Sequence, residues 1–124
     1  MSGLFKEDSG RIGFVISSLF AGALDLDELQ KWAIGVLARE QDPPLYLVDL
    51  AEFNDAIYKI YKVIGFVPHW PHPADQKDAL IGIAYKRGRV LGDSPLSREQ
   101  ALQKLVNCPH IEAAFRTEFP FVNL

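Results

Sequence analysis

Apolar residues recur along the chain at spacings of three and four positions, which is the period of an α-helix rather than of a strand. Ile12, Val15, Ile16, Leu19 and Phe20 form the first such stripe, and Gly22 follows it as a stop. Further helical patterns occupy residues 26–37, 42–51, 53–64, 74–86, 97–106 and 109–119. The pattern therefore predicts an all-α fold of six to seven short helices, and only residues 45–48 also suit a strand.

Residues at three of the predicted helix starts support this division. Asp25 with Glu28, and Ser97 with Gln100, have the spacing of capping boxes, in which the two residues bond each other's backbone N–H groups. Pro109 suits the first turn of a helix, where a missing N–H group is tolerated. We therefore expect helices to begin directly after Asp25 and Ser97 and at Pro109.

The middle of the chain contains two predicted interruptions. The run Asp42–Pro44 is interpreted as an N-cap followed by prolines in the first turn. Polar Asn54 falls where the following apolar stripe would continue, so we expect a break there, with one bent helix as the alternative. Three prolines between Phe66 and Asp75 exclude a regular helix. We expect a loop in that segment, attached to the core by Trp70.

Composition and length fit one compact domain spanning residues 1–124. With 48% hydrophobic and 23% charged residues, the chain differs from disordered proteins. Charged residues interrupt every apolar run, so no segment reaches the roughly 20 apolar residues that a membrane span requires. Acidic residues near the N-terminus do not fit a secretion signal. We expect a cytoplasmic protein that does not bind a membrane.

Few residues suit catalysis or metal binding. The single cysteine, Cys108, excludes an intramolecular disulfide and a metal site built from several cysteines. His69 and His72 are spaced H-x-x-H, but no neighbouring cysteine or carboxylate completes a tetrahedral metal site. Cys108 and His110 can pair as thiol and base, although a catalytic pair also needs an orienting group. We expect no catalytic residue, no metal and no cofactor.

Charge is distributed unevenly along the chain, whose formal net charge is −3. Residues 25–55 hold eight acidic and two basic residues, a net charge of −6, whereas residues 59–104 hold four acidic and eight basic residues, a net charge of +4. The basic run at residues 86–89 lacks interleaved aromatic residues, so we expect no direct binding of nucleic acid. That run is typical of a solvated helix C-terminus, where cations complement the helix dipole.

The acidic segment can form a binding face. If the chain stays helical from Asp49 to Asp55, then Asp49, Glu52 and Asp55 lie on one side, because residues three apart are neighbours on a helix. Such a face attracts a basic protein partner. The alternative is that these acids form an ordinary solvated face, or that the basic segment of the same chain neutralises them.

Three apolar segments carry a resemblance to a known family: residues 43–50 (PPLYLVDL), 58–66 (YKIYKVIGF) and 80–88 (LIGIAYKRG). In these segments the chain resembles the small all-helical immunity proteins of bacterial contact-dependent growth inhibition systems, in particular those paired with a ribonuclease toxin. The resemblance implies a cytoplasmic, non-catalytic protein that binds the toxin domain of its cognate effector. Such a protein blocks the active site or the substrate groove of the toxin.

Charge, rather than the resemblance, selects the candidate binding residues. A nuclease is basic where it binds RNA, so an acidic helical surface can occupy that region as a phosphate mimic. The candidate partner-binding residues are Asp25, Asp27, Glu28, Asp42, Asp49, Glu52 and Asp55. The alternative function is a small helical hydrolase or nucleic-acid-processing enzyme that uses His69, His72 or His110 with one of the acids.

Overall fold

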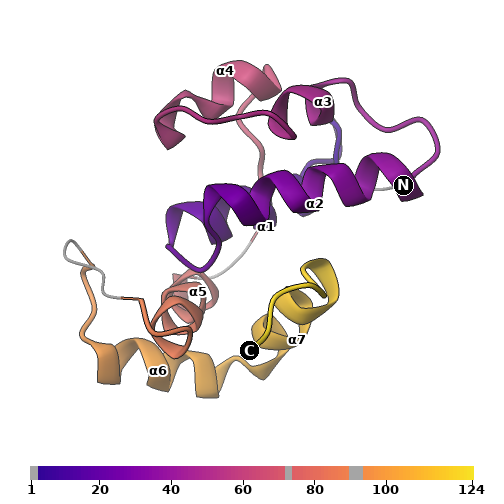
Figure 1. The fold of residues 1–124 in the computed structure, drawn as a ribbon. Helices are drawn as coiled ribbons and strands as arrows, with labels where there is room; N and C mark the ends of the chain where they lie inside the picture. The colour runs from indigo at the N-terminus through magenta and orange to yellow at the C-terminus, as the bar shows by residue number, and fades with distance from the viewer. Residues whose placement is uncertain (1–2, 72–73, 90–93) are drawn as a thin grey trace. The chain divides into compact units, whose positions relative to one another are not determined.

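The structure is a computed structural model that describes residues 3–71, 74–89 and 94–124. Within these residues the regular elements are α1 (Gly10–Phe20), α2 (Leu26–Arg39), α3 (Tyr46–Leu50), the 3-10 helix η1 (Ile57–Lys59), α4 (Ile60–Ile64), α5 (Ala74–Lys86), α6 (Arg98–Asn107) and α7 (Pro109–Glu118), all of them helical (Figure 1). The predicted all-α class is confirmed. The alternative of a strand at residues 45–48 is wrong, because these residues form the start of α3.

The chain divides into two units. The N-terminal unit comprises the described residues up to Ile16 together with Asp25–Pro71, and the C-terminal unit comprises Ser17–Leu24 with the described residues after Pro71. Helix α1 therefore contributes residues 10–16 to the first unit and residues 17–20 to the second. That residues 1–124 form one domain stays a prediction.

Helix α2 provides much of the core of the N-terminal unit. The Asp25 Oδ1 atom accepts the Glu28 N–H at 2.8 Å and the Glu28 Oε1 atom accepts the Asp25 N–H at 3.0 Å, which confirms the predicted capping box. The buried stripe consists of Leu29, Trp32, Ala33 and Val36. Leu37, which the pattern also places inward, is only half-buried at the edge of this stripe.

Helix α3 begins later than the sequence predicts. Its N-cap is Leu45, so the interpretation of Asp42 as the N-cap and of the two prolines as the first turn is wrong. The physical reason is that Asp42 has φ +51°, in the left-handed region, whereas an N-cap residue is extended. The chain turns at Asp42, and Leu47 and Leu50 then pack α3 against α2, fully buried as predicted.

The break near Asn54 is confirmed, and the alternative of one bent helix is wrong. After α3 the backbone N–H groups bond carbonyls three residues back, as in a 3-10 helix. The last of these bonds in the segment joins the Phe53 N–H to the Leu50 carbonyl at 3.2 Å. The Phe53 carbonyl accepts the Gln30 side-chain N–H at 2.7 Å instead of a backbone N–H one turn later. Helicity resumes in η1 and α4, which ends at Gly65 with φ +91°.

The proline-containing loop is attached to the N-terminal unit as predicted. The Trp70 ring meets the Phe14 ring edge-on, with centroids 5.1 Å apart. A Cβ atom at Gly13 would lie 2.8 Å from the Trp70 Cβ atom, so only glycine allows this approach. The backbone N–H of His69 donates to the Ser9 hydroxyl at 2.8 Å. The loop is therefore held by both apolar and polar contacts.

In the C-terminal unit, α5 has the predicted bounds and packs closely on α6. A Cβ atom at Gly82 would lie 2.4 Å from the Ala101 carbonyl oxygen, so glycine permits the close helix approach. The predicted capping box of Ser97 and Gln100 opens α6, and Pro109 opens α7. On the predicted stripes, Ala114 and Phe20 are exposed, since each lies at the margin of the buried face of its helix.

The basic run at the end of α5 is bonded within the C-terminal unit rather than simply solvated. Arg87 Nη1 donates to the Ala23 carbonyl and Arg89 Nη1 donates to the Gly22 carbonyl, each at 2.6 Å. These carbonyls follow the end of α1, where backbone acceptors lack helical partners. The expectation of a freely solvated helix end is therefore wrong for these two arginines.

Candidate functional site

The outer side of α3 combines apolar and acidic side chains. Leu45, Val48, Asp49 and Glu52 follow the spacing i, i+3, i+4 and i+7, so they share one face, which we term the α3 surface. Leu45 is 86% exposed and Val48 is 49% exposed, and both carboxylates are also exposed. The Glu52 N–H donates to the Asp49 carbonyl at 3.2 Å, which keeps Glu52 in the helical turn. This surface offers apolar area and negative charge together.

Asp55 does not belong to the α3 surface. The unbroken helix from Asp49 to Asp55, on which the alignment of the three acids depended, is absent from this segment. Instead, Asp55 Oδ1 accepts the Ala56 N–H at 2.7 Å and lies 3.5 Å from Lys59 Nζ. The hydrogen bond from Ala56 is the main cause that lowers the pKa of Asp55, and Lys59 adds to it. This carboxylate is therefore already paired within its own chain.

The three acids at the start of α2 lie near one end of the α3 surface. Asp25 and Glu28 bond each other in the capping box, and Asp27 is exposed in the same first turn. Gln30, one turn along α2, bonds the carbonyl of Phe53, which directly follows Glu52. The first turn of α2 and the end of the α3 surface therefore occupy the same end of the N-terminal unit.

Asp42 lies at the other end of α2. A helix of 14 residues is about 21 Å long, and Asp42 follows its C-terminal end. There it borders a pocket of about 400 Å³ that is also lined by Leu4, Phe5 and Pro44. The acidic residues proposed from the sequence thus form separate groups rather than one patch, and Asp42 is the most distant from the α2 first turn.

The C-terminal unit contains a groove that the sequence analysis missed, which we term the α6–α7 groove. It has a volume of about 640 Å³. Its apolar lining consists of Leu102, Leu105, Val106, Pro109 and Ala113. Its charged lining consists of Lys86, Arg98, Glu112 and Arg116. The signal that could have revealed it is a second stripe at helical spacing, through residues 98, 102, 105 and 106 in α6 and 109, 112, 113 and 116 in α7.

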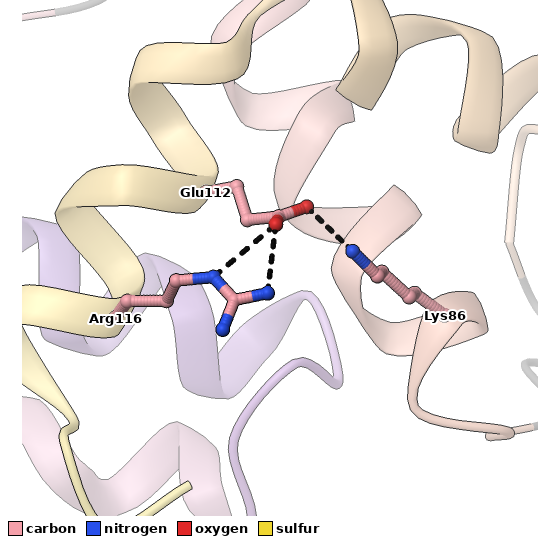
Figure 2. A network of polar contacts seen from close by, with 3 residues as sticks. All are labelled: Lys86, Glu112 and Arg116. Carbon is pink, nitrogen blue, oxygen red and sulfur yellow. Dashed lines mark hydrogen bonds and ion pairs between the residues drawn. The ribbon is translucent and has the colours of Figure 1, made fainter. Parts of the chain in front are cut away.

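A network of ion pairs forms the charged wall of this groove (Figure 2). Glu112 Oε1 accepts Lys86 Nζ at 2.9 Å, and Glu112 Oε2 accepts Arg116 Nε at 3.2 Å and Nη2 at 3.0 Å. The bond from Lys86 is the main cause that lowers the pKa of Glu112, and Arg116 contributes further. Arg98 Nη1 donates to the Tyr85 carbonyl at 3.2 Å. Two cations therefore bond one carboxylate, and a third cation, Arg98, lines the same groove.

The residues considered for catalysis or metal binding are dispersed. His69 is exposed in the loop of the N-terminal unit, and His110 is exposed in the first turn of α7. Cys108 is buried, with its Sγ atom 3.9 Å from the Asp75 carbonyl oxygen. His72 lies outside the described residues. In the described part of the chain, no group of three or more histidine, cysteine or acidic side chains is arranged to hold a metal ion.

Comparisons with models of protein families, with curated proteins and with solved structures find no match to this chain. Among the helices that the structure describes, none has the length and apolar character needed to cross a membrane. Function is therefore inferred from the two surfaces and from the resemblance in the sequence.

Proposed function

We propose that this chain is a non-catalytic immunity protein that binds and neutralises a cognate bacterial toxin domain, a ribonuclease, by blocking its active site or substrate groove. The observation that carries the proposal is the α3 surface, on which two exposed apolar side chains lie beside two carboxylates. Three of its four residues lie within residues 43–50, one of the segments that resemble immunity proteins. The proposal places the protein in the cytoplasm.

The α3 surface supplies both parts of a specific interface. Leu45 and Val48 offer apolar area that a partner can bury. Asp49 and Glu52 attract a cationic RNA-binding groove and take the place of phosphates in it. Because a stable interface covers about 800 Å² on each partner, the first turn of α2, at the same end of the unit, extends the contact through Asp27.

The test first captures the partner and then measures how tightly variants of this chain bind it. The tagged chain is purified from its native host, the captured protein is identified, and its toxic domain is expressed alone and together with this chain. Expression of the domain alone should stop growth, and co-expression should restore it. In calorimetry, Asp49→Lys with Glu52→Lys should weaken binding at least about tenfold, because two attractive contacts become repulsive.

The matched control is Glu7→Lys with Glu99→Lys, which makes the same change in net charge at two exposed acids outside the α3 surface. This control should bind within about threefold of the unmodified chain, because neither acid belongs to the proposed contact and salt screens charges outside it. A captured protein without toxicity overturns the proposal. If the two double variants lose affinity equally, the α3 surface is not the binding site for the toxin domain.

A further inference from the structure

The α6–α7 groove has an apolar floor that its own unit leaves uncovered. Val106 is 70% exposed, and Pro109 and Ala113 are exposed beside it. Leu102 is half-buried on the turn before Val106, so the exposed area is continuous along α6. Concave apolar surface of this kind marks places where another molecule binds.

The rim of the groove has an excess of positive charge. The lining holds three cations, Lys86, Arg98 and Arg116, and one carboxylate, Glu112, which leaves a net charge of +2 around the apolar floor. Arg116 uses its Nε and Nη2 groups on Glu112, and Lys86 uses one of its three N–H groups. Donors on both side chains therefore remain for carboxylates that approach from outside.

We propose that the α6–α7 groove binds an amphipathic, acidic α-helical segment of a protein partner. Such a helix places apolar side chains at i, i+3 or i+4, and i+7 into a groove between helices. Acidic residues along its flanks would meet Lys86, Arg98 and Arg116, whereas a basic helix would be repelled. The groove is open to solvent along α6 and α7, which favours an extended macromolecular segment over a small ligand, whose site encloses most of its surface.

This inference does not rest on the proposed function. It concerns a different unit of the chain and a partner of the opposite charge, so the failure of one leaves the other standing. The α3 surface attracts cations through Asp49 and Glu52, and the α6–α7 groove attracts carboxylates.

The experiment uses the full chain and two labelled synthetic helices. The first has leucines at i, i+3, i+4 and i+7 with glutamates on both flanks, and the second has lysines in place of the glutamates. Fluorescence anisotropy should show binding of the glutamate helix with a Kd on the order of micromolar and binding of the lysine helix at least about tenfold weaker. Added salt should reduce this difference, because the discriminating charges are solvent-exposed.

Two variants locate the binding site. Val106→Asp should weaken binding of the glutamate helix at least about tenfold, because it places a like charge in the apolar floor. The matched control, Gln103→Asp, adds the same carboxylate to α6 at an exposed position outside the lining of the groove and should leave the Kd within about twofold. Far-UV circular dichroism and thermal unfolding verify that both variants fold.

Three results would overturn the inference: equal affinity for the two helices, no binding of either helix at high micromolar concentration, or an unchanged Kd in Val106→Asp. Laurate serves as the competing probe for a small amphipathic anion. Displacement of the glutamate helix by laurate at concentrations below those of the helix itself would assign the groove to such a ligand instead.

Discussion

The two units of the molecule use their charged side chains differently. In the N-terminal unit, Asp49 and Glu52 extend into solvent beside exposed apolar neighbours on the α3 surface. In the C-terminal unit, Arg87 and Arg89 each donate to a backbone carbonyl at the end of α1. The net charge of a segment therefore does not by itself identify an interface. An interface requires charges that the chain leaves available to a partner.

Ion pairs within the chain also engage part of its charge. Lys86 and Lys104 of the C-terminal unit form ion pairs with Glu112 and Asp75, at 2.9 Å and 2.5 Å. Asp55 is likewise paired with Lys59, whereas charge borders exposed apolar side chains on the α3 surface and around the floor of the α6–α7 groove. Three predictions test this difference, in order of decreasing effect.

The first prediction tests which side of α3 faces outward. Leu47 is fully buried, whereas Leu45, two positions earlier, is 86% exposed. We expect Leu47→Ala to lower the free energy of unfolding by about 2–5 kcal/mol, because it leaves a cavity in the core. Leu45→Ala should change it by no more than about 0.5 kcal/mol. Urea denaturation monitored by circular dichroism measures both values.

If Leu45→Ala proved as destabilising as Leu47→Ala, then Leu45 would be a core residue and the α3 surface would lose its apolar part. The proposed immunity function would lose its supporting observation with it. The comparison is well matched, because both substitutions remove the same atoms and both positions belong to the same helical turn.

Local features of the sequence predicted much of the fold. The capping boxes at Asp25 and Ser97 and the bounds of α5 depend on residues a few positions apart, and each is confirmed. The left-handed conformation of Asp42 was not predicted, because aspartate has no φ preference as strong as that of glycine. The bond from Gln30 to the Phe53 carbonyl joins positions distant in sequence, so the position of Asp55 also escaped prediction.

The candidate surfaces were harder to predict than the helices. Helix α3 has only five residues and carries apolar side chains on both sides, so the pattern that predicted Leu47 and Leu50 as buried did not identify Leu45 and Val48 as an exposed apolar surface. The α6–α7 groove depends on how two successive helices diverge after Cys108, which no local pattern specifies. Its charged wall needs Lys86, which comes from α5.

The second prediction tests whether the basic run of the C-terminal unit is engaged internally. We expect Arg87→Ala with Arg89→Ala to lower the free energy of unfolding by about 1–3 kcal/mol, since each change removes a charged donor from a half-buried carbonyl. The control Lys62→Ala with Lys77→Ala removes two exposed cations and should cost at most about 0.5 kcal/mol. Equal stabilities of the two double variants would show that the arginines are merely solvated.

The third and smallest effect concerns the pH dependence that Glu112 gives to the C-terminal unit. Lys86 and Arg116 lower the pKa of Glu112 in the folded state below its ordinary value of about 4.5. The folded state therefore binds fewer protons at this site than the unfolded state does. The resulting stabilisation is complete above pH 4.5 and disappears as the pH falls through the folded-state pKa.

Substitution of Glu112 isolates this contribution. The difference in unfolding free energy between the unmodified chain and Glu112→Gln should stay below about 1 kcal/mol at neutral pH, because the ion pairs are partly solvated, and should shrink towards zero in acid. Urea denaturation at a series of pH values measures it. The variant Lys86→Gln should by itself raise the pKa of Glu112 towards the ordinary value, as followed by NMR. If this difference in unfolding free energy grew as the pH fell, Glu112 would be protonated more readily in the folded chain than in the unfolded chain. Lys86 and Arg116 would then lie too far from Glu112 to form the charged wall of the groove.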